Sequence, residues 1–239
     1  MRKIALFLSF FIFLAAAFWI RATKSFFNDT EKIAGNVLSV ATSWVSGTPT
    51  PSPTLPPAPE FTPTPTSIPL ANHLVINEVY YDADDTHLIE RNENRSEWIE
   101  IYNPTSNPIN VKNWQVLDNN SSETFPDLTI PAGGFLILAG ATSSAELKPV
   151  WPSLPDDVLF VSASGQEIGN GLANNGDRVI LKDNLGNVVG QMSYGNDSSV
   201  FNPPCPDVDE GHSLERSPAG KDTDTAGDFV DRYPPTPGS

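Results

Sequence analysis

The chain has a single cysteine among its 239 residues, Cys205, which lies within a proline-rich stretch. One cysteine cannot form an intramolecular disulfide or a paired-thiolate metal site. We therefore expect Cys205 to be a small, partly buried side chain in a loop, with an intermolecular disulfide as the alternative.

Basic side chains are also few. The chain carries 14 Lys+Arg against 29 Asp+Glu, a net charge of -15. From residue 72 onward, 26 Asp and Glu stand against 9 Lys and Arg, so this part alone has a net charge of -17. Such a charge repels phosphate backbones, which argues against nucleic-acid binding through a basic patch. It favours solubility and cationic partners.

Long apolar runs are absent except at the start of the chain. Residues 4–20 are apolar apart from Ser9, and basic residues flank the run. As a signal peptide, the run would be cleaved near Ala15–Ala17. As an uncleaved anchor, it is at the short end of what spans a bilayer. We favour the anchor because the run continues past the alanines. Residues 1–24 thus predict a single-pass cell-membrane protein with an extracytoplasmic C-terminal domain, or a secreted protein if the segment is cleaved.

Two connecting segments follow the apolar run. Residues 25–46 have a soft amphipathic pattern, which predicts a helical segment next to the membrane. Residues 47–70 are rich in proline, threonine and serine. Proline lacks an amide donor and fixes φ, so this segment should be a disordered, extended linker. It would act as a stalk that holds the next domain away from the membrane.

Short β-type segments separated by Gly, Pro and Asn fill residues 71–239, with at most one helical turn near residues 144–148. This pattern predicts one all-β sandwich domain. The expected strands lie within residues 73–81, 97–103, 107–111, 113–117, 128–138, 158–161, 178–182, 188–194 and 212–216.

The segment from Glu97 to Asn103 is the most informative of these, and it stops at Pro104. Side chains of a strand alternate between its faces. Trp98, Glu100 and Tyr102 therefore share one face, while two isoleucines occupy the other. Both faces are largely apolar, which is typical of an inner strand.

Several segments together resemble the lamin tail domain family, in the exported form that carries an N-terminal anchor and a proline-rich stalk. The resemblance implies an immunoglobulin-like sandwich that acts as a non-catalytic binding or structural module. It implies no cofactor. The segments that carry it are 76–79, 97–104, 111–114, 130–135, 175–181, 183–186, 213–216, 228–229 and 235–238.

Two strand glutamates, Glu78 and Glu100, are the first candidates for chemistry, because paired carboxylates can act as acid and base. We favour a structural role in which they pair with Arg178, Arg216 or backbone amides at a sheet end. The histidines are scattered and have no nucleophile pattern around them. They are His73, His87 and His212.

A loop with Asp82, Asp84 and Asp85 is the sharpest carboxylate cluster. Alternating aspartates can supply oxygen ligands to Ca²⁺, but the glycine and glutamate of an EF-hand loop are missing here. We therefore expect solvated loops, with Ca²⁺ binding as the alternative. Two similar groups follow, Asp222 with Asp224 and Asp207 with Asp209 and Glu210.

The sequence thus assigns no catalytic, cofactor-binding or metal-binding residue. The leading hypothesis is a membrane-tethered, extracytoplasmic module, displayed on a stalk, that binds an unknown protein or cell-envelope partner. One alternative is a divalent-metal-dependent hydrolase or nuclease accessory domain that uses the acidic loops. Another is a structural component that associates with itself, and the oligomeric state stays open.

Overall fold

The structure, a computed structural model, describes residues 70–239. The predictions for residues 1–24, 25–46 and all but the last residue of 47–70 lie outside this range. No helix within the described range is long and apolar enough to cross a membrane.

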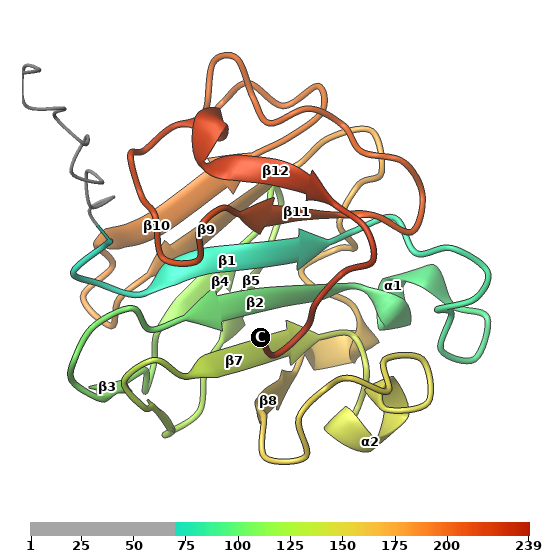
Figure 1. Cartoon of the computed structure of the whole chain (residues 1–239), viewed down its shortest axis with the longest axis horizontal. Helices are drawn as coiled ribbons and strands as arrows, with labels where there is room; N and C mark the ends of the chain where they lie inside the picture. Colours follow the sequence, from blue (N-terminus) through green and yellow to red (C-terminus); the bar gives the residue numbers. More distant parts are fainter. Residues whose placement is uncertain (1–69) are drawn as a thin grey trace, which may run out of the picture. The chain divides into compact units, whose positions relative to one another are not determined.

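The regular secondary structure of the described chain is mostly β (Figure 1). One sheet has six strands, in the order β12 (Phe229–Arg232), β11 (Ser213–Arg216), β1 (Val75–Tyr80), β2 (Trp98–Tyr102), β7 (Phe135–Ala139) and β8 (Leu159–Ser162). A second sheet has four, in the order β10 (Val188–Ser193), β9 (Arg178–Lys182), β4 (Gln115–Leu117) and β5 (Ser122–Thr124). A two-stranded ribbon pairs β3 (Ile109–Asn110) with β6 (Thr129–Ile130). The helices are single turns, α1 (Glu93–Ser96), α2 (Ser144–Leu147), η1 (Ser164–Gln166) and η2 (Ala226–Asp228).

A common core joins the two larger sheets. The six-stranded sheet contributes Ile99 and Leu138, and the four-stranded sheet contributes Val116, Val179 and Leu181, all of them buried. All paired strands are antiparallel except β7 and β8, which run parallel. A mostly β fold with two sheets around one core is consistent with the immunoglobulin-like sandwich that the sequence predicts.

Strand β2 is an inner strand, as its sequence predicted. It lies between β1 and β7, and its isoleucines enter the core between the sheets. Trp98 belongs to a second cluster on the outer face of the six-stranded sheet. There it stacks on Tyr80 at 5.7 Å, and Trp151 meets the Tyr80 ring edge-on at 5.1 Å. The loop around α2 supplies Trp151 and thereby covers this part of the face.

Besides the 3₁₀ turns η1 and η2, three elements were not predicted, for different reasons. Strand β5 is short and polar, with only Glu123 buried. Strand β12 is an edge strand in which only Phe229 is buried. Helix α1 is one turn that begins at Asn92, whose side chain accepts from the amide of Arg95. None of the three has the apolar periodicity on which strand and helix predictions rest.

Cys205 is completely buried rather than partly so, and it is a free thiol. Its amide donates to the carbonyl of Ser193 at 2.8 Å, which fixes the proline-rich loop beside β10. Burial disfavours the intermolecular disulfide that we kept as an alternative.

The six-stranded sheet has two distinct ends (Figure 1). At the entry end, Val75 of β1 lies opposite Tyr102, where the chain comes in from Leu70. At the far end, Tyr80 lies opposite Trp98. Six strand residues separate the ends by about 20 Å. Loops from several strands gather at each end.

Candidate functional site

The outer face of the six-stranded sheet carries a row of three glutamates. Glu78 of β1 lies opposite Glu215 of β11 on one side and Glu100 of β2 on the other. Glu78 and Glu100 have no exposed surface. We call these three residues the glutamate row. Like charges directly opposite one another on a sheet are unfavourable, so the row requires compensation.

The compensation comes from the last residues of the chain. The amide of Thr236 donates to Glu78 Oε1 at 3.0 Å, and its hydroxyl donates to Glu78 Oε2 at 3.1 Å. The amide of Gly238 donates to Glu100 Oε2 at 2.6 Å. Within the sheet, Ser213 Oγ donates to Glu78 Oε1 at 2.5 Å, and Asn77 Nδ2 donates to Glu100 Oε1 at 2.7 Å.

These contacts correct part of our sequence prediction. Backbone amides do hold Glu78 and Glu100, but neither predicted arginine does. Arg178 pairs with Asp197 at 3.3 Å. Arg216 is buried and donates to the carbonyl of Ile76 at 2.8 Å, and it pairs with two aspartates of the loop after β11.

Neither carboxyl forms an ion pair in the described domain, so burial has the largest effect on the pKa of both. Burial raises the pKa of Glu78 to about 7, although hydrogen bonds from Ser213 and Thr236 oppose it. Burial raises the pKa of Glu100 to about 8, and the charge of Glu78 adds to the effect. A neutral carboxyl at neutral pH can donate a hydrogen bond as well as accept one. The pair is enclosed by the end of the chain, which suits a structural role better than acid-base chemistry on a substrate.

A second acidic group lies at the far end. We define the far-end acidic group as Asp82, Glu93, Glu97, Asp177 and Asp207. None of the five takes part in an ion pair within residues 70–239.

Neutral hydrogen-bond donors hold the carboxylates of this group in place. The side-chain nitrogen Nδ2 of Asn174 donates to Asp82 Oδ1 at 2.9 Å and to Glu93 Oε1 at 2.6 Å. The backbone amide of Leu172 donates to Glu97 Oε2 at 2.9 Å. The hydroxyl of Tyr81 donates to Asp207 Oδ1 at 2.8 Å.

Crowding and burial weaken the acidity of the far-end group. Burial, with the charges of Glu93 and Glu210, raises the pKa of Asp82 to about 6. Burial also raises the pKa of Glu97 to about 9. The hydroxyl of Tyr194 is buried near Asp177 and Glu97 and has no hydrogen-bond partner among residues 70–239.

The loop at Asp82–Asp85 does not gather its carboxylates. Asp84 Oδ1 accepts from the amides of Thr86 and His87 at 3.2 and 3.1 Å, so it shapes the turn. Asp82 instead points to Asn174, and Asp85 is exposed. Among the described residues, no three His, Cys, Asp or Glu side chains are placed to hold a metal ion.

The histidines each meet a different aspartate. The imidazole of His73 lies 3.7 Å from Asp222, that of His87 lies 2.5 Å from Asp84, and that of His212 lies 2.7 Å from Asp231.

Sequence reasoning missed Thr236, Gly238 and Asn174, the donors that hold the carboxylates. Each is small or polar and lies in an irregular segment, so periodicity gives no signal. Residues 235–238 were noted only as part of the family resemblance, with no role assigned to Thr236 or Gly238.

The profile of the Lamin Tail Domain family matches residues 69–196, which is more than half of the chain. The chain belongs to the lamin tail domain family. This match confirms the family that the sequence resembles, over the segments from residue 76 to residue 186. Strands β11 and β12 and the last residues of the chain lie beyond the matched range. No curated protein matches the chain.

Lamin tail domains are immunoglobulin-like domains that generally have binding or structural roles and are not catalytic. The enclosed glutamate row and the neutral donors of the far-end group fit such a domain.

Proposed function

We propose that this lamin tail domain is an extracytoplasmic binding module, tethered to the membrane by residues 1–24 and displayed on the stalk formed by residues 47–70. The sequence of the apolar run supports an anchor, and the proline-rich stretch supports a spacer. The module binds a protein or cell-envelope partner through its loops.

The position of the chain entry is the observation that carries this proposal. The chain comes in from Leu70 at the entry end, beside Val75 and Tyr102. Three members of the far-end acidic group, Asp82, Glu93 and Glu97, lie between β1 and β2, at the opposite end of these strands. A tether attached at the entry end leaves the far-end loops free to meet a partner.

The charge of the far end defines the partner. Asp82, Glu93 and Asp207 keep exposed surface and have no ion-paired Lys or Arg in the described domain, which makes this end a place for a cationic group. Burial raises the pKa of Asp82, so a cation that approaches this carboxylate would gain more than at a fully solvated surface. The partner surface is accordingly rich in Lys or Arg.

Protease treatment of intact cells that produce the full chain tests the location. Cleavage of the stalk in intact cells, with release of the domain and retention of the N-terminal segment in the membrane, is the expected result. Protection of the stalk until the cells are lysed would overturn the proposal.

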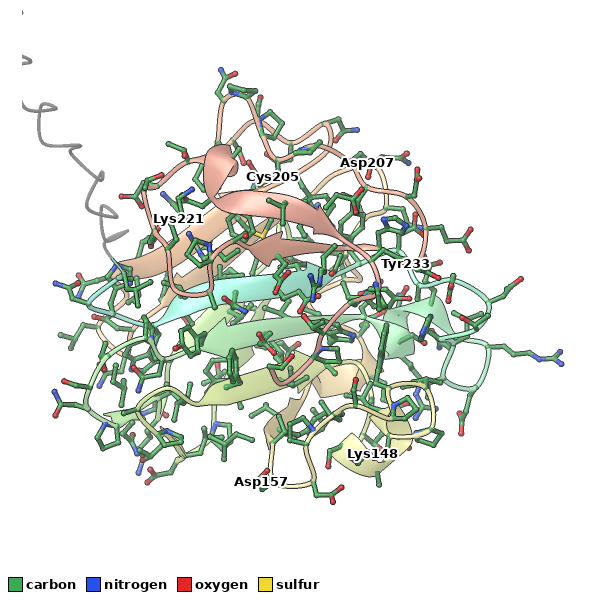
Figure 2. The ribbon with its side chains drawn as sticks, in the orientation of Figure 1. Lys148, Asp157, Cys205, Asp207, Lys221 and Tyr233 are labelled. Carbon is green, nitrogen blue, oxygen red and sulfur yellow. The ribbon has the colours of Figure 1, made fainter. Side chains whose placement is uncertain are left out.

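A labelled oligolysine peptide tests the surface. We compare the double variant Asp85→Asn/Glu210→Gln, which alters exposed side chains beside the far-end group, with Asp156→Asn/Asp157→Asn. The latter pair precedes β8, near the entry end, and makes the same change of charge. Figure 2 shows Asp157 and Asp207 on different sides of the domain. Several-fold weaker binding only for the far-end variant supports the proposal; equal losses would show non-specific attraction and would contradict it.

A further inference from the structure

The last seven residues, Tyr233–Ser239, run from β12 across the outer face of the six-stranded sheet (Figure 1). Tyr233 marks the start of this segment in Figure 2. Thr236 reaches the carboxylate of Glu78 on β1, and Gly238 reaches that of Glu100 on β2. We call this segment the strap, because it crosses the strands instead of pairing along them.

The strap is attached by packing and by hydrogen bonds: Pro235 and Pro237 are buried, and Tyr233 stacks on His212. Three of its seven residues are prolines, which have no amide donor. The amides of Thr236 and Gly238 both bond to the glutamate row, and the amide of Ser239 bonds back to the carbonyl of Thr236 at 3.2 Å. The strap has no charged side chain, so it offers dipoles rather than a counter-charge to the carboxylates.

The surface under the strap is crowded with negative charge. Glu78 faces Glu100 on β2 and Glu215 on β11, and Ser213 is the neutral donor from β11. Arg232 of β12 pairs with the row, because its Nε lies 3.3 Å from Glu215 Oε2. His212 of the segment before β11 stacks on Tyr233 of the strap at 4.7 Å and pairs with Asp231 instead of the row. Arg232 serves the outermost glutamate and leaves the two buried ones without an ion pair in the described residues.

We propose that the strap is a pH-dependent cover, closed on the glutamate row in mildly acidic medium and released in alkaline medium, where it exposes an acidic strip on the outer face of the sheet. This property belongs to the domain itself and does not depend on the tether. Once exposed, the strip is a second surface for a cationic ligand.

The direction of the pH dependence follows from the pKa values of the Glu78 and Glu100 carboxyls. Their pKa values in the closed state, about 7 and about 8, lie above the ordinary value of 4.5. The closed state therefore binds protons more tightly than an open state in which water reaches both groups. Closure is fully favoured below about 4.5 and weakens as pH rises through 7 and 8. The equilibrium shifts toward release by up to roughly tenfold per pH unit for each carboxyl that ionises.

The hydrogen bonds from the strap do not reverse this sign. Bonds from Thr236 and Gly238 favour the ionised carboxylates, but burial is the larger effect at both glutamates. Asn77 acts in the same direction as the strap, because its Nδ2 donates to Glu100 Oε1 and favours the ionised carboxylate, and this effect too is smaller than burial.

Hydrogen exchange of the strap amides in the purified full chain tests the proposal, from pH 6 to 9 and corrected for the intrinsic rate. In the wild type, we expect the protection of the Thr236 and Gly238 amides to fall at least tenfold across this range. The amide of Leu138, in the centre of β7, is the internal reference for global opening. Unchanged protection of the strap amides would overturn the proposal, and so would a parallel loss at Leu138.

Two variants separate the charge from the contact. In Glu78→Gln/Glu100→Gln, neither side chain ionises, so protection should stay flat with pH; a wild-type profile would overturn the proposal.

Gly238→Ala keeps both glutamates, but its φ of +85° is unfavourable for alanine and the added Cβ would lie 2.5 Å from Pro155 Cδ. Low strap protection at every pH, with Leu138 unchanged, is expected. Wild-type protection in Gly238→Ala would contradict the position of Gly238 against Glu100 and Pro155.

Discussion

Glu78 and Glu100 are direct cross-strand neighbours, and two amides that lie two residues apart in the same strap hold them. A sheet face that would otherwise present ionised carboxylates to each other is thereby closed by the chain itself. The relationship links the stability of this lamin tail domain to pH.

The substitution Glu100→Gln should raise stability in alkaline medium. The folded pKa of Glu100, about 8, exceeds its ordinary value of 4.5, so its contribution to stability is complete below 4.5 and is lost as pH rises through about 8. The variant avoids that loss, which is on the order of a few kcal/mol at pH 9. Thermal unfolding at pH 5 and 9 checks this. Asp156→Asn, at a side chain 94% exposed, is the control and should show no such pH difference. A Glu100→Gln variant that melts below the wild type at pH 9 would contradict the assignment.

The two arginines that the sequence offered as partners for the glutamates should behave differently. Arg216→Ala removes a buried guanidinium that pairs with Asp222 and Asp228, each at 3.2 Å, and should cost about 3–5 kcal/mol. Arg178→Ala removes a partly exposed partner of Asp197 and should cost about 1 kcal/mol or less. Urea unfolding followed by circular dichroism measures both. Equal losses of unfolding free energy in the two variants would contradict the prediction that burial of the arginine sets the cost.

The stacked tyrosines Tyr81 and Tyr194 provide a matched pair, with ring centroids 4.0 Å apart. The hydroxyl of Tyr194 has no partner among residues 70–239, so Tyr194→Phe should be neutral or stabilising by about 1 kcal/mol. The hydroxyl of Tyr81 donates to Asp207 and accepts from the amide of Val208, each at 2.8 Å. Tyr81→Phe should therefore cost about 1–3 kcal/mol. Denaturant melts that give the opposite order would contradict this pairing.

Cys205 should be inert in the folded protein. Burial raises the pKa of its thiol to about 12, so thiolate is scarce at neutral pH. Labelling with a thiol reagent should occur only as fast as the domain unfolds, and denaturant should make it immediate. Val188→Cys places a thiol at a residue 51% exposed and should react at once. Fast labelling of Cys205 in the wild type would contradict its burial.

Strand periodicity predicted much of the described fold but not the way its carboxylates are held. Strand β2 was predicted correctly because apolar side chains on both of its faces specify an inner position. Strand β12 was not, because only Phe229 is buried and an edge strand leaves little pattern. The partners of Glu78 and Glu100 depend on contacts across about 140 to 160 residues, and neither Thr236 nor Gly238 has a local feature that marks it as a donor. The Pro131–Gly134 turn was recognised, although β6 pairs with β3 rather than with β7.

The position of β1 has a mechanical consequence. The strand that receives the chain at Leu70 is bonded on both sides, to β11 and to β2. A pull between the tether and a partner at the far end would act along β1, and its inter-strand hydrogen bonds lie perpendicular to that direction. They would be loaded together in shear instead of opening one after another. With the proposed tether in place, the domain would therefore resist force along the direction of β1.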